Sequence, residues 1–250
     1  MGDPRSRELE LQSHPAVELV FEGVAAPPCR VAVPATVYPP RADTELLDAT
    51  LAELRVGRDA RLLEIGCGCG AAAIAAALRG MRVVACDVNP LAVAASRGNA
   101  ERAGVGERLD VLEAGIGEDG SWPDAVVGPF DVICWNTPYL DDGEARDDPG
   151  VAGPDGLGPL EDAGLLDLAG EAGWTGTLLS ALVSRPDVLA EGGVVLLVHA
   201  DTARGELAQT RWRRMGFATR ALARERLGGD ERLTAFAAWI PWGGLAPEWA

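Results

Sequence analysis

Short apolar runs alternate with helical patterns along most of the 250 residues. Five of these runs have the length and the Val, Ile and Leu content of buried strands, whereas the segments between them space their apolar residues as amphipathic helices do. The expected strands are residues 60–65, 82–86, 109–112, 130–135 and 194–198, and the expected helices are residues 43–54, 71–78, a segment from 89, 177–185 and 207–215. Alternating strands and helices are typical of an α/β domain with a mostly parallel sheet.

The N-terminal part of the chain departs from this alternation. Residues 17–24 alternate apolar and polar side chains, and residues 31–33 form a second short apolar run. We therefore expect a hairpin within an N-terminal extension of residues 1–36. The polar residues 1–12 are expected to be frayed.

The C-terminal part predicts a second hairpin. Residues 219–225 and 233–240 are strand-like and flank a pair of glycines. We assign the main domain to residues 37–242, which include this hairpin, and a short aromatic tail to residues 243–250.

A glycine-rich turn joins the first expected strand of the main domain to its helix. Gly66, Gly68 and Gly70 stand at alternate positions, and Glu64 lies two residues ahead of the first. Glycine allows positive φ and lets a ligand touch the backbone, while the helix directs unpaired N–H groups at the turn. A close-packed structural turn has the same composition, so the pattern alone leaves both interpretations open. The spacing resembles motif I of class I S-adenosylmethionine (SAM) methyltransferases, which implies that these residues and Cys67 bind the cofactor.

An acidic residue ends the second strand of this expected sheet. Asp87 follows the glycines at the separation, about 20 residues, where such folds place the carboxylate that binds a ribose diol. The alternative is that Asp87 only caps the next helix. Asp87, Val88 and Asn89 resemble motif II of the same methyltransferases, which favours ribose binding. Those enzymes carry an Asp after the third strand, beside the adenine. This chain has Glu113 there as the expected substitute.

A segment with two prolines, residues 37–47, precedes the glycine turn. The prolines prevent a helix at their own positions, and Asp43 or Thr44 can cap one that follows. A capped amphipathic helix is one interpretation. The string also resembles the segment just ahead of the SAM domain in the HemK/PrmC family of glutamine N-methyltransferases. Because that segment borders the cofactor in the family, the resemblance implies that Thr44 and Arg41 are cofactor-side residues.

The fourth strand is followed at once by Asn136, Thr137, Pro138 and Tyr139. This tetrapeptide resembles the N-P-P-Y motif of methyltransferases that act on a nitrogen conjugated to a planar system. The resemblance implies that the Asn136 side-chain oxygen and the Thr137 carbonyl accept the two N–H groups of that nitrogen, hold it in line with the methyl group and stabilise its developing charge. Pro138 stiffens the loop, and Tyr139 stacks on the planar group. Thr137 replaces a proline, which predicts a less rigid loop. The alternative is an ordinary turn after a strand.

Residues 140–166 and His199 lie near the expected site, and each has two alternative roles. Residues 140–166 are acidic, rich in Gly and Pro, and too long and polar for a plain connection. In this topology they lie over the active site, so a lid or a substrate-selecting loop is expected, with a disordered insertion as the alternative. A lid of this charge would favour a cationic substrate or partner. His199 ends the fifth strand, and we expect a structural imidazole there rather than a base.

The charge and composition of the chain disfavour some classes of binding partner. The net charge is −16, and all 22 basic residues are arginine. Because the longest basic cluster is residues 211–214, nucleic acid is a disfavoured partner. No apolar run is long enough for a bilayer and no signal peptide opens the chain, so we expect no membrane association and a cytoplasmic location. The five cysteines show no metal-ligand spacing, so no metal site is expected, and Cys86 and Cys134 are expected to pack as small apolar groups.

These features predict a Rossmann-like class I methyltransferase, an α/β fold with a mostly parallel seven-stranded sheet, an antiparallel last strand and helices on both faces. Its cofactor is expected to be SAM, with S-adenosylhomocysteine as product. The resemblance implies N-methylation of a planar nitrogen, first of all a protein glutamine such as that of the release-factor GGQ loop. The alternatives are an N-methyltransferase of a small molecule or natural product and a non-catalytic SAM-binding scaffold or subunit. Short members of the family rely on a small zinc-binding activator subunit, so that partner is also implied.

Overall fold

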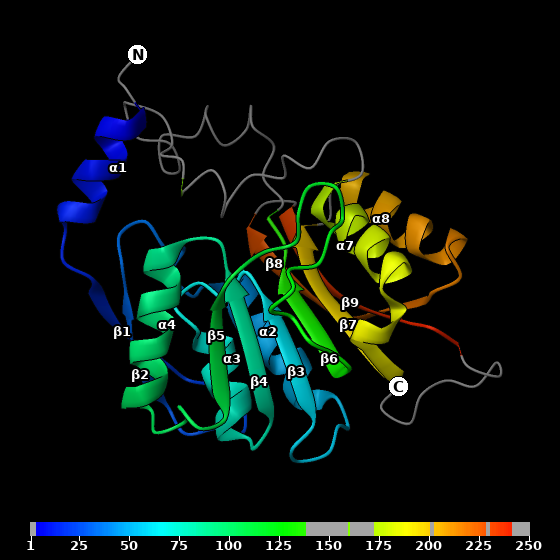
Figure 1. The fold of residues 1–250 in the computed structure, drawn as a ribbon, viewed down its shortest axis with the longest axis horizontal. Coiled ribbons are helices and arrows are strands. Elements are labelled where there is room, and N and C mark those ends of the chain that lie inside the picture. The colour runs from blue at the N-terminus through cyan, green and yellow to red at the C-terminus, as the bar shows by residue number, and fades with distance from the viewer. Residues whose placement is uncertain (1–3, 139–159, 161–172, 201–202, 229–230, 242–250) are drawn as a thin grey trace.

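The computed structural model describes residues 4–138, 160, 173–200, 203–228 and 231–241 (Figure 1). Tyr139, the tail at 243–250 and the segment expected to form a lid, apart from Leu160, lie outside these residues. The described part contains a seven-stranded sheet and a separate two-stranded sheet, with helices packed against them.

The seven-stranded sheet has the strand order β5-β4-β3-β6-β7-β9-β8. Its strands are β3 (Arg61–Ile65), β4 (Arg82–Asp87), β5 (Leu109–Glu113), β6 (Phe130–Asn136), β7 (Leu189–Ala200), β8 (Ala218–Gly228) and β9 (Glu231–Trp239). The first five strands in this order are parallel, whereas β9 runs antiparallel to both β7 and β8. The predicted mostly parallel sheet with an antiparallel last strand is therefore confirmed.

Helices cover both faces of the sheet, as predicted (Figure 1). The helices are α2 (Ala42–Glu53), α3 (Ala71–Leu78) and α4 (Pro90–Arg102) on one face, and α7 (Gly173–Ser184) and α8 (Ala203–Arg214) on the other, with a 3-10 turn η2 (Pro186–Val188) ahead of β7. Side chains alternate along β3: Leu62 packs into the core on the α3 side and Leu63 into the core on the α7 side, both fully buried.

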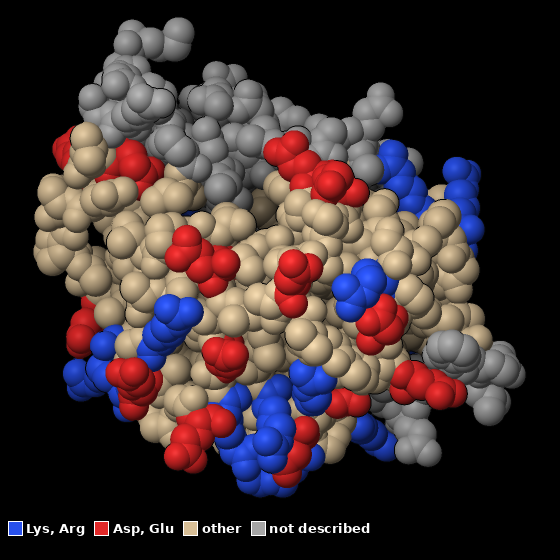
Figure 2. Space-filling model, in the orientation of Figure 1, with Lys and Arg blue, Asp and Glu red and all other residues tan. Residues whose placement is uncertain are grey.

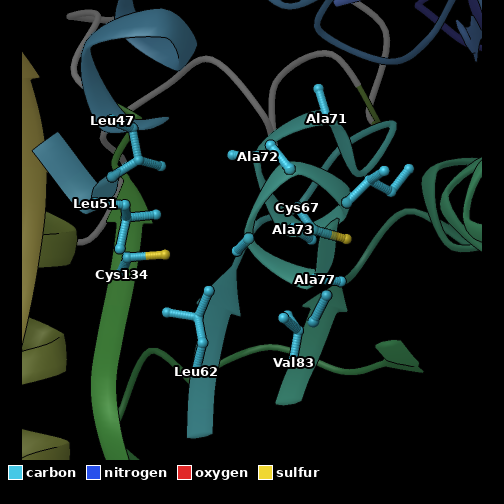
Figure 3. Packing of buried hydrophobic residues seen from close by; sticks show 14 of the residues in the cluster. Leu47, Leu51, Leu62, Cys67, Ala71, Ala72, Ala73, Ala77, Val83 and Cys134 are labelled. Atoms are coloured by element: carbon cyan, nitrogen blue, oxygen red, sulfur yellow. The ribbon is translucent and has the colours of Figure 1, made fainter. Parts of the chain in front are cut away.

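The alanine-rich helix α3 packs closely against the sheet. Ala72, Ala73 and their neighbours are buried in the cluster that includes Leu62 and Cys134 of the adjacent strands (Figure 3). Alanine combines high helix propensity with a small side chain, so the helix axis can approach the strands. This packing fixes where the amino end of α3 meets the turn after β3.

The N-terminal hairpin is confirmed. Strands β1 (Val17–Phe21) and β2 (Cys29–Val33) pair antiparallel, with Val17 opposite Val33. Phe21 and Val31 are buried in the same core cluster as α2, α3 and α4. The hairpin thus shares the apolar core of the main domain.

A buried ion pair fastens the loop of this hairpin to two helices. Arg79, after α3, lies 2.6 Å from Asp48 of α2, whose side chain is 1% exposed. The Val24 N–H donates to Asp48 Oδ2 at 2.7 Å, and Arg79 donates to the Val24 carbonyl at 2.9 Å. Each charge therefore satisfies a backbone group as well as its partner, which buried charges require.

The expectation that residues 1–12 are frayed is wrong for the described part of this segment, because α1 (Pro4–Ser13) is a helix. Glu8 is buried, accepts a hydrogen bond from Gln12 Nε2 at 3.0 Å, and accepts another from the Leu160 N–H at 3.2 Å. The segment has no apolar stripe that would predict a helix, and Leu160 is distant in sequence. Its contact with the rest of the chain is therefore invisible to local pattern.

Strand β7 differs in length from the prediction, whereas Cys86 and Cys134 lie as predicted. The fifth parallel strand is longer than the predicted 194–198, because β7 begins at Leu189 and continues through a polar and glycine-containing stretch. All five cysteines are free and buried. Cys86 and Cys134 are 2% and 0% exposed, so the prediction that they pack as small apolar groups is confirmed.

Candidate functional site

The glycine turn follows β3 at the carboxyl edge of the sheet. Gly66, Gly68 and Gly70 all have left-handed φ, at 64°, 55° and 81°, where other residues would be strained. A Cβ on Gly70 would lie 2.3 Å from Ser96 Oγ, so α4 packs directly on the turn. The Gly70 N–H donates to the Cys67 carbonyl at 2.8 Å. Because α3 begins at the next residue, its first N–H groups border the turn.

The Cys67 side chain belongs to the core rather than to the surface of the turn. It is 6% exposed and lies in the apolar cluster of Figure 3. Burial raises the pKa of the Cys67 thiol well above its usual value. Its backbone N–H donates to the Cys86 carbonyl at 3.1 Å, which ties the turn to β4.

Asp87 holds the glycine turn from the end of β4. Its Oδ2 accepts the Gly68 N–H at 2.8 Å and its Oδ1 accepts the Asn89 N–H at 2.9 Å. Burial raises its pKa, and the backbone N–H donors oppose that shift. The cap of α4 is Asn89, whose Oδ1 accepts the Leu91 N–H at 2.9 Å, so the alternative role of Asp87 as helix cap is wrong. Each Asp87 oxygen retains acceptor capacity for a ligand.

Of the residues near Asp87, Glu113 and Val88 are exposed, whereas Asn89 is buried. Glu113 is exposed and pairs in register with Asp87 at the carboxyl ends of β5 and β4. Val88 is 55% exposed, and a Cβ on Gly115 would lie 2.5 Å from it. The Asn89 side chain is 5% exposed and donates to the Thr36 carbonyl at 3.1 Å, so it joins α4 to the segment after β2.

Glu64 places a buried carboxyl beside the turn. It is 5% exposed and accepts a hydrogen bond from the Ala73 N–H in the first turn of α3. Its Oε2 has no hydrogen-bond partner within the described part of the chain. Burial raises the pKa of Glu64 to about 8, opposed by the Ala73 N–H and supported by the negative charges of Asp48 and Asp87.

Val37 and Tyr38, at the start of the segment ahead of α2, lie against the glycine turn. A Cβ on Gly68 would lie 3.6 Å from a Val37 methyl group and 3.7 Å from the Tyr38 carbonyl. The Tyr38 hydroxyl donates to Asp43 Oδ2 at 2.9 Å, and the guanidinium of Arg41 lies 5.3 Å from the Tyr38 ring centre. Thr44 Oγ1 accepts the Arg41 N–H at 3.4 Å at the start of α2. Arg41 is exposed and Thr44 half-buried.

Asn136 ends β6 one residue beyond the registered pair of Ile65 and Trp135. This register places Asn136 level with Gly66, next to the glycine turn. The Asn136 Oδ1 is buried and has no hydrogen-bond partner among the described residues. A buried amide oxygen costs free energy unless a donor reaches it, so the atom is a ready acceptor for a ligand N–H.

The residues after Asn136 are held by β7. The Thr137 N–H and its hydroxyl both donate to the Val198 carbonyl, at 3.1 and 2.9 Å. Thr137 is 2% exposed, and Pro138 is half-buried. The expected loss of rigidity at Thr137 is thus offset by two hydrogen bonds that proline could not make.

Sequence reasoning missed Asn99 of α4, which is fully buried behind the turn. Its Oδ1 accepts the Ala32 N–H at 2.8 Å, and its Nδ2 donates to the carbonyls of Ala32 at 3.0 Å and Cys69 at 2.8 Å. One amide therefore joins β2, α4 and the glycine turn. A polar residue on the buried side of a helix was the available signal.

Aromatic residues flank the same edge. A Cβ on Gly66 would lie 3.0 Å from Trp135 Nε1, and the Trp135 ring centre lies 5.9 Å from that of Trp174 in α7. His199 is 4% exposed, and its Nδ1 lies 2.7 Å from the Ala200 carbonyl. The centre of its ring lies 5.2 Å from that of Phe236, with the two planes at 66°. These contacts favour the structural imidazole.

The described residues contain no group of three or more His, Cys, Asp or Glu that could hold a metal ion. None of the helices in the described ranges is long and apolar enough to cross a membrane. Arginines gather at the lower edge of the face in Figure 2. Arg82 and Arg108 pair with Asp59 near the amino ends of β4 and β5, at the opposite ends of these strands from the glycine turn.

Residues 44–137 match the family model described as ribosomal protein L11 methyltransferase (PrmA). The release factor glutamine methyltransferase of Salmonella typhimurium is 34% identical over 205 residues, which cover 80% of this chain and 67% of that protein. Five bacterial release factor glutamine methyltransferases match over 38% to 67% of their own length.

Solved structures share the fold. The E. cuniculi Mtq2–Trm112 complex, responsible for methylation of the eRF1 translation termination factor, matches at a TM-score of 0.51 and 20% identity, over 82% of this chain and 99% of that chain. The T. thermophilus 16S rRNA methyltransferase RsmC, in complex with AdoMet and guanosine, matches at a TM-score of 0.58 and 17% identity, over 91% of this chain and 51% of that chain. The sequence relatives confirm the predicted SAM-dependent methyltransferase class, and these solved structures confirm its fold.

Proposed function

The chain belongs to the release factor glutamine methyltransferase family, and on that basis we propose that it transfers the SAM methyl group to the side-chain nitrogen of a protein glutamine, first of all in a release factor. A cytoplasmic site of action goes with such a substrate.

The observation that carries this proposal is the Asn136 amide oxygen. It is buried, lacks a hydrogen-bond partner in the described part of the chain, and stands level with the glycine turn. A glutamine amide carries two N–H donors and a delocalised lone pair, so it needs acceptors more than it needs a base. Asn136 Oδ1 and the Thr137 carbonyl would accept these donors, orient the nitrogen and stabilise the positive charge that develops on it.

The carboxyl edge of the sheet fits a SAM cofactor, which supplies an electrophilic methyl group when bound. Asp87 offers acceptor capacity for a ribose diol, and Glu113 lies beside it in register. The glycine turn lets a ligand approach the backbone and the first N–H groups of α3. The Glu64 oxygen that has no partner among the described residues offers an acceptor beside the turn, and it presents a negative charge to a cationic part of the ligand when Glu64 ionises.

The test is transfer of labelled methyl from SAM to the purified release factors of the host. Label in a release factor, absent when its candidate glutamine is changed to Asn and absent with the Asn136→Ala enzyme, is the expected result. SAM binding by calorimetry should persist in Asn136→Ala, because that residue faces the acceptor. Label that appears only in a small-molecule fraction of host extract would refute the protein substrate.

The same assay tests the partner. The E. cuniculi relative is a complex with Trm112, and a small zinc-binding activator is part of our proposal for this chain. We expect the purified chain to gain methyl transfer when host extract is added, and to gain less when a tagged inactive copy of the chain has first removed its binding partners from that extract. Full activity of the purified chain alone would exclude the activator.

A further inference from the structure

Thr137 makes two hydrogen bonds to one carbonyl at the end of the parallel β6–β7 ladder. Asn136 and Val198 are the last registered pair of β6 and β7, and the Thr137 N–H continues the ladder to the Val198 carbonyl. The Thr137 hydroxyl donates to that same carbonyl at 2.9 Å. Two donors from one residue thus converge on one oxygen, which has a lone pair for each.

This pair of hydrogen bonds fixes the residue that carries the proposed backbone acceptor. The N–H bond restrains the peptide between Asn136 and Thr137, and the hydroxyl bond restrains χ1 of a side chain that is already β-branched. The Thr137 carbonyl is one bond from the restrained Cα, and the Asn136 side chain is on the restrained strand end. The positions of both acceptor oxygens therefore depend on the hydrogen bonds to Val198 of β7.

We propose that the Thr137 side chain is a positioning residue, which aims the Asn136 oxygen and the Thr137 carbonyl at the acceptor nitrogen by anchoring their backbone to β7. The inference rests on the proposed function, because it concerns the same acceptor oxygens. Proline at this position would restrain φ but would supply neither donor. The two ways of holding the loop exclude each other, and this chain uses hydrogen bonds.

Three variants separate the contributions. Thr137→Val keeps the shape and the N–H but removes the hydroxyl, Thr137→Ser keeps both donors, and Thr137→Pro removes both. We expect Thr137→Val to lower kcat by about three- to tenfold, the effect of one hydrogen bond, and Thr137→Pro to lower it further. Thr137→Ser should lose less than Thr137→Val. The Kd for SAM should change less than twofold in the Val and Ser variants.

The measurements are kcat and KM on the release factor, SAM binding by calorimetry, and hydrogen exchange of backbone amides in the free chain. Thr137→Val should speed exchange of the amide of residue 137 severalfold and leave amides of β3 unchanged. An equal kcat for wild type and Thr137→Val, or a higher kcat for Thr137→Pro, would overturn the proposal. If wild type methylates no protein, the proposed function fails, whereas unchanged exchange in Thr137→Val shows separately that the anchor is wrong.

Discussion

The buried carboxyl of Glu64 should make the unfolding free energy depend on pH, which tests whether this group is protonated in the folded chain. Burial raises the pKa of this carboxyl from 4.5 to about 8. Between these pH values the folded chain keeps a proton that the unfolded chain has released. The contribution to stability is therefore fully present below pH 4.5 and is lost as pH rises toward 8, by up to about 1.4 kcal/mol for each pH unit.

The perturbation is Glu64→Gln, which keeps the shape and cannot ionise. Across the window of about 3.5 pH units, the loss from Glu64 alone is bounded at roughly 5 kcal/mol. We expect the unfolding free energy of the wild type to fall relative to that of Glu64→Gln as pH rises from 5 to 8. Asp87, whose pKa burial also raises, is present in both proteins and cancels in the difference.

The assay is urea denaturation without SAM, followed by tryptophan fluorescence at several pH values between 5 and 9. Glu113→Gln is the matched control, because it makes the same substitution at an exposed carboxyl at the same edge of the sheet. A constant difference between wild type and Glu64→Gln over the whole range would refute the buried neutral carboxyl. The affinity for SAM should change with pH in the opposite direction to stability. It should tighten as pH rises toward 8, because the ionised form of Glu64 attracts the cationic cofactor.

Three further predictions follow from the scaffold. Gly70→Ala should weaken SAM binding at least tenfold by calorimetry, because Gly70 has φ of 81° and no room for a Cβ, whereas Gly57→Ala, with nothing within 4 Å, should bind normally. Asp48→Ala should lower the unfolding free energy by about 3–5 kcal/mol in urea titration, because it leaves Arg79 buried without its partner; a loss below about 1 kcal/mol would contradict the ion pair's role. Asn99→Asp keeps one acceptor but loses both donors, so the Kd for SAM should rise about tenfold, and an unchanged Kd would show that the turn does not depend on it.

Local chemistry was enough to predict the frame of the site. Strand and helix order follow from hydrophobic periodicity, and the left-handed turn follows from Gly66, Gly68 and Gly70, because only glycine adopts that φ without strain. The position of Asp87 beside the turn follows from topology, since carboxyl ends of neighbouring parallel strands meet at one edge.

Long-range packing decided what the side chains do. Asn99 joins Ala32 and the turn across 67 and 30 residues, and Thr137 meets Val198 across 61, so no local window contains either contact. The neutral state of Glu64 is likewise a product of burial beneath α3, because a carboxyl's pKa depends on its surroundings and not on its place in a motif. Sequence by itself determined which residues stand at the strand ends. Tertiary structure decided whether such a residue holds the turn, as Asp87 does, or presents a buried oxygen with no partner among the described residues, as Asn136 does. That difference depends on hydrogen-bond partners that come together only when the chain folds.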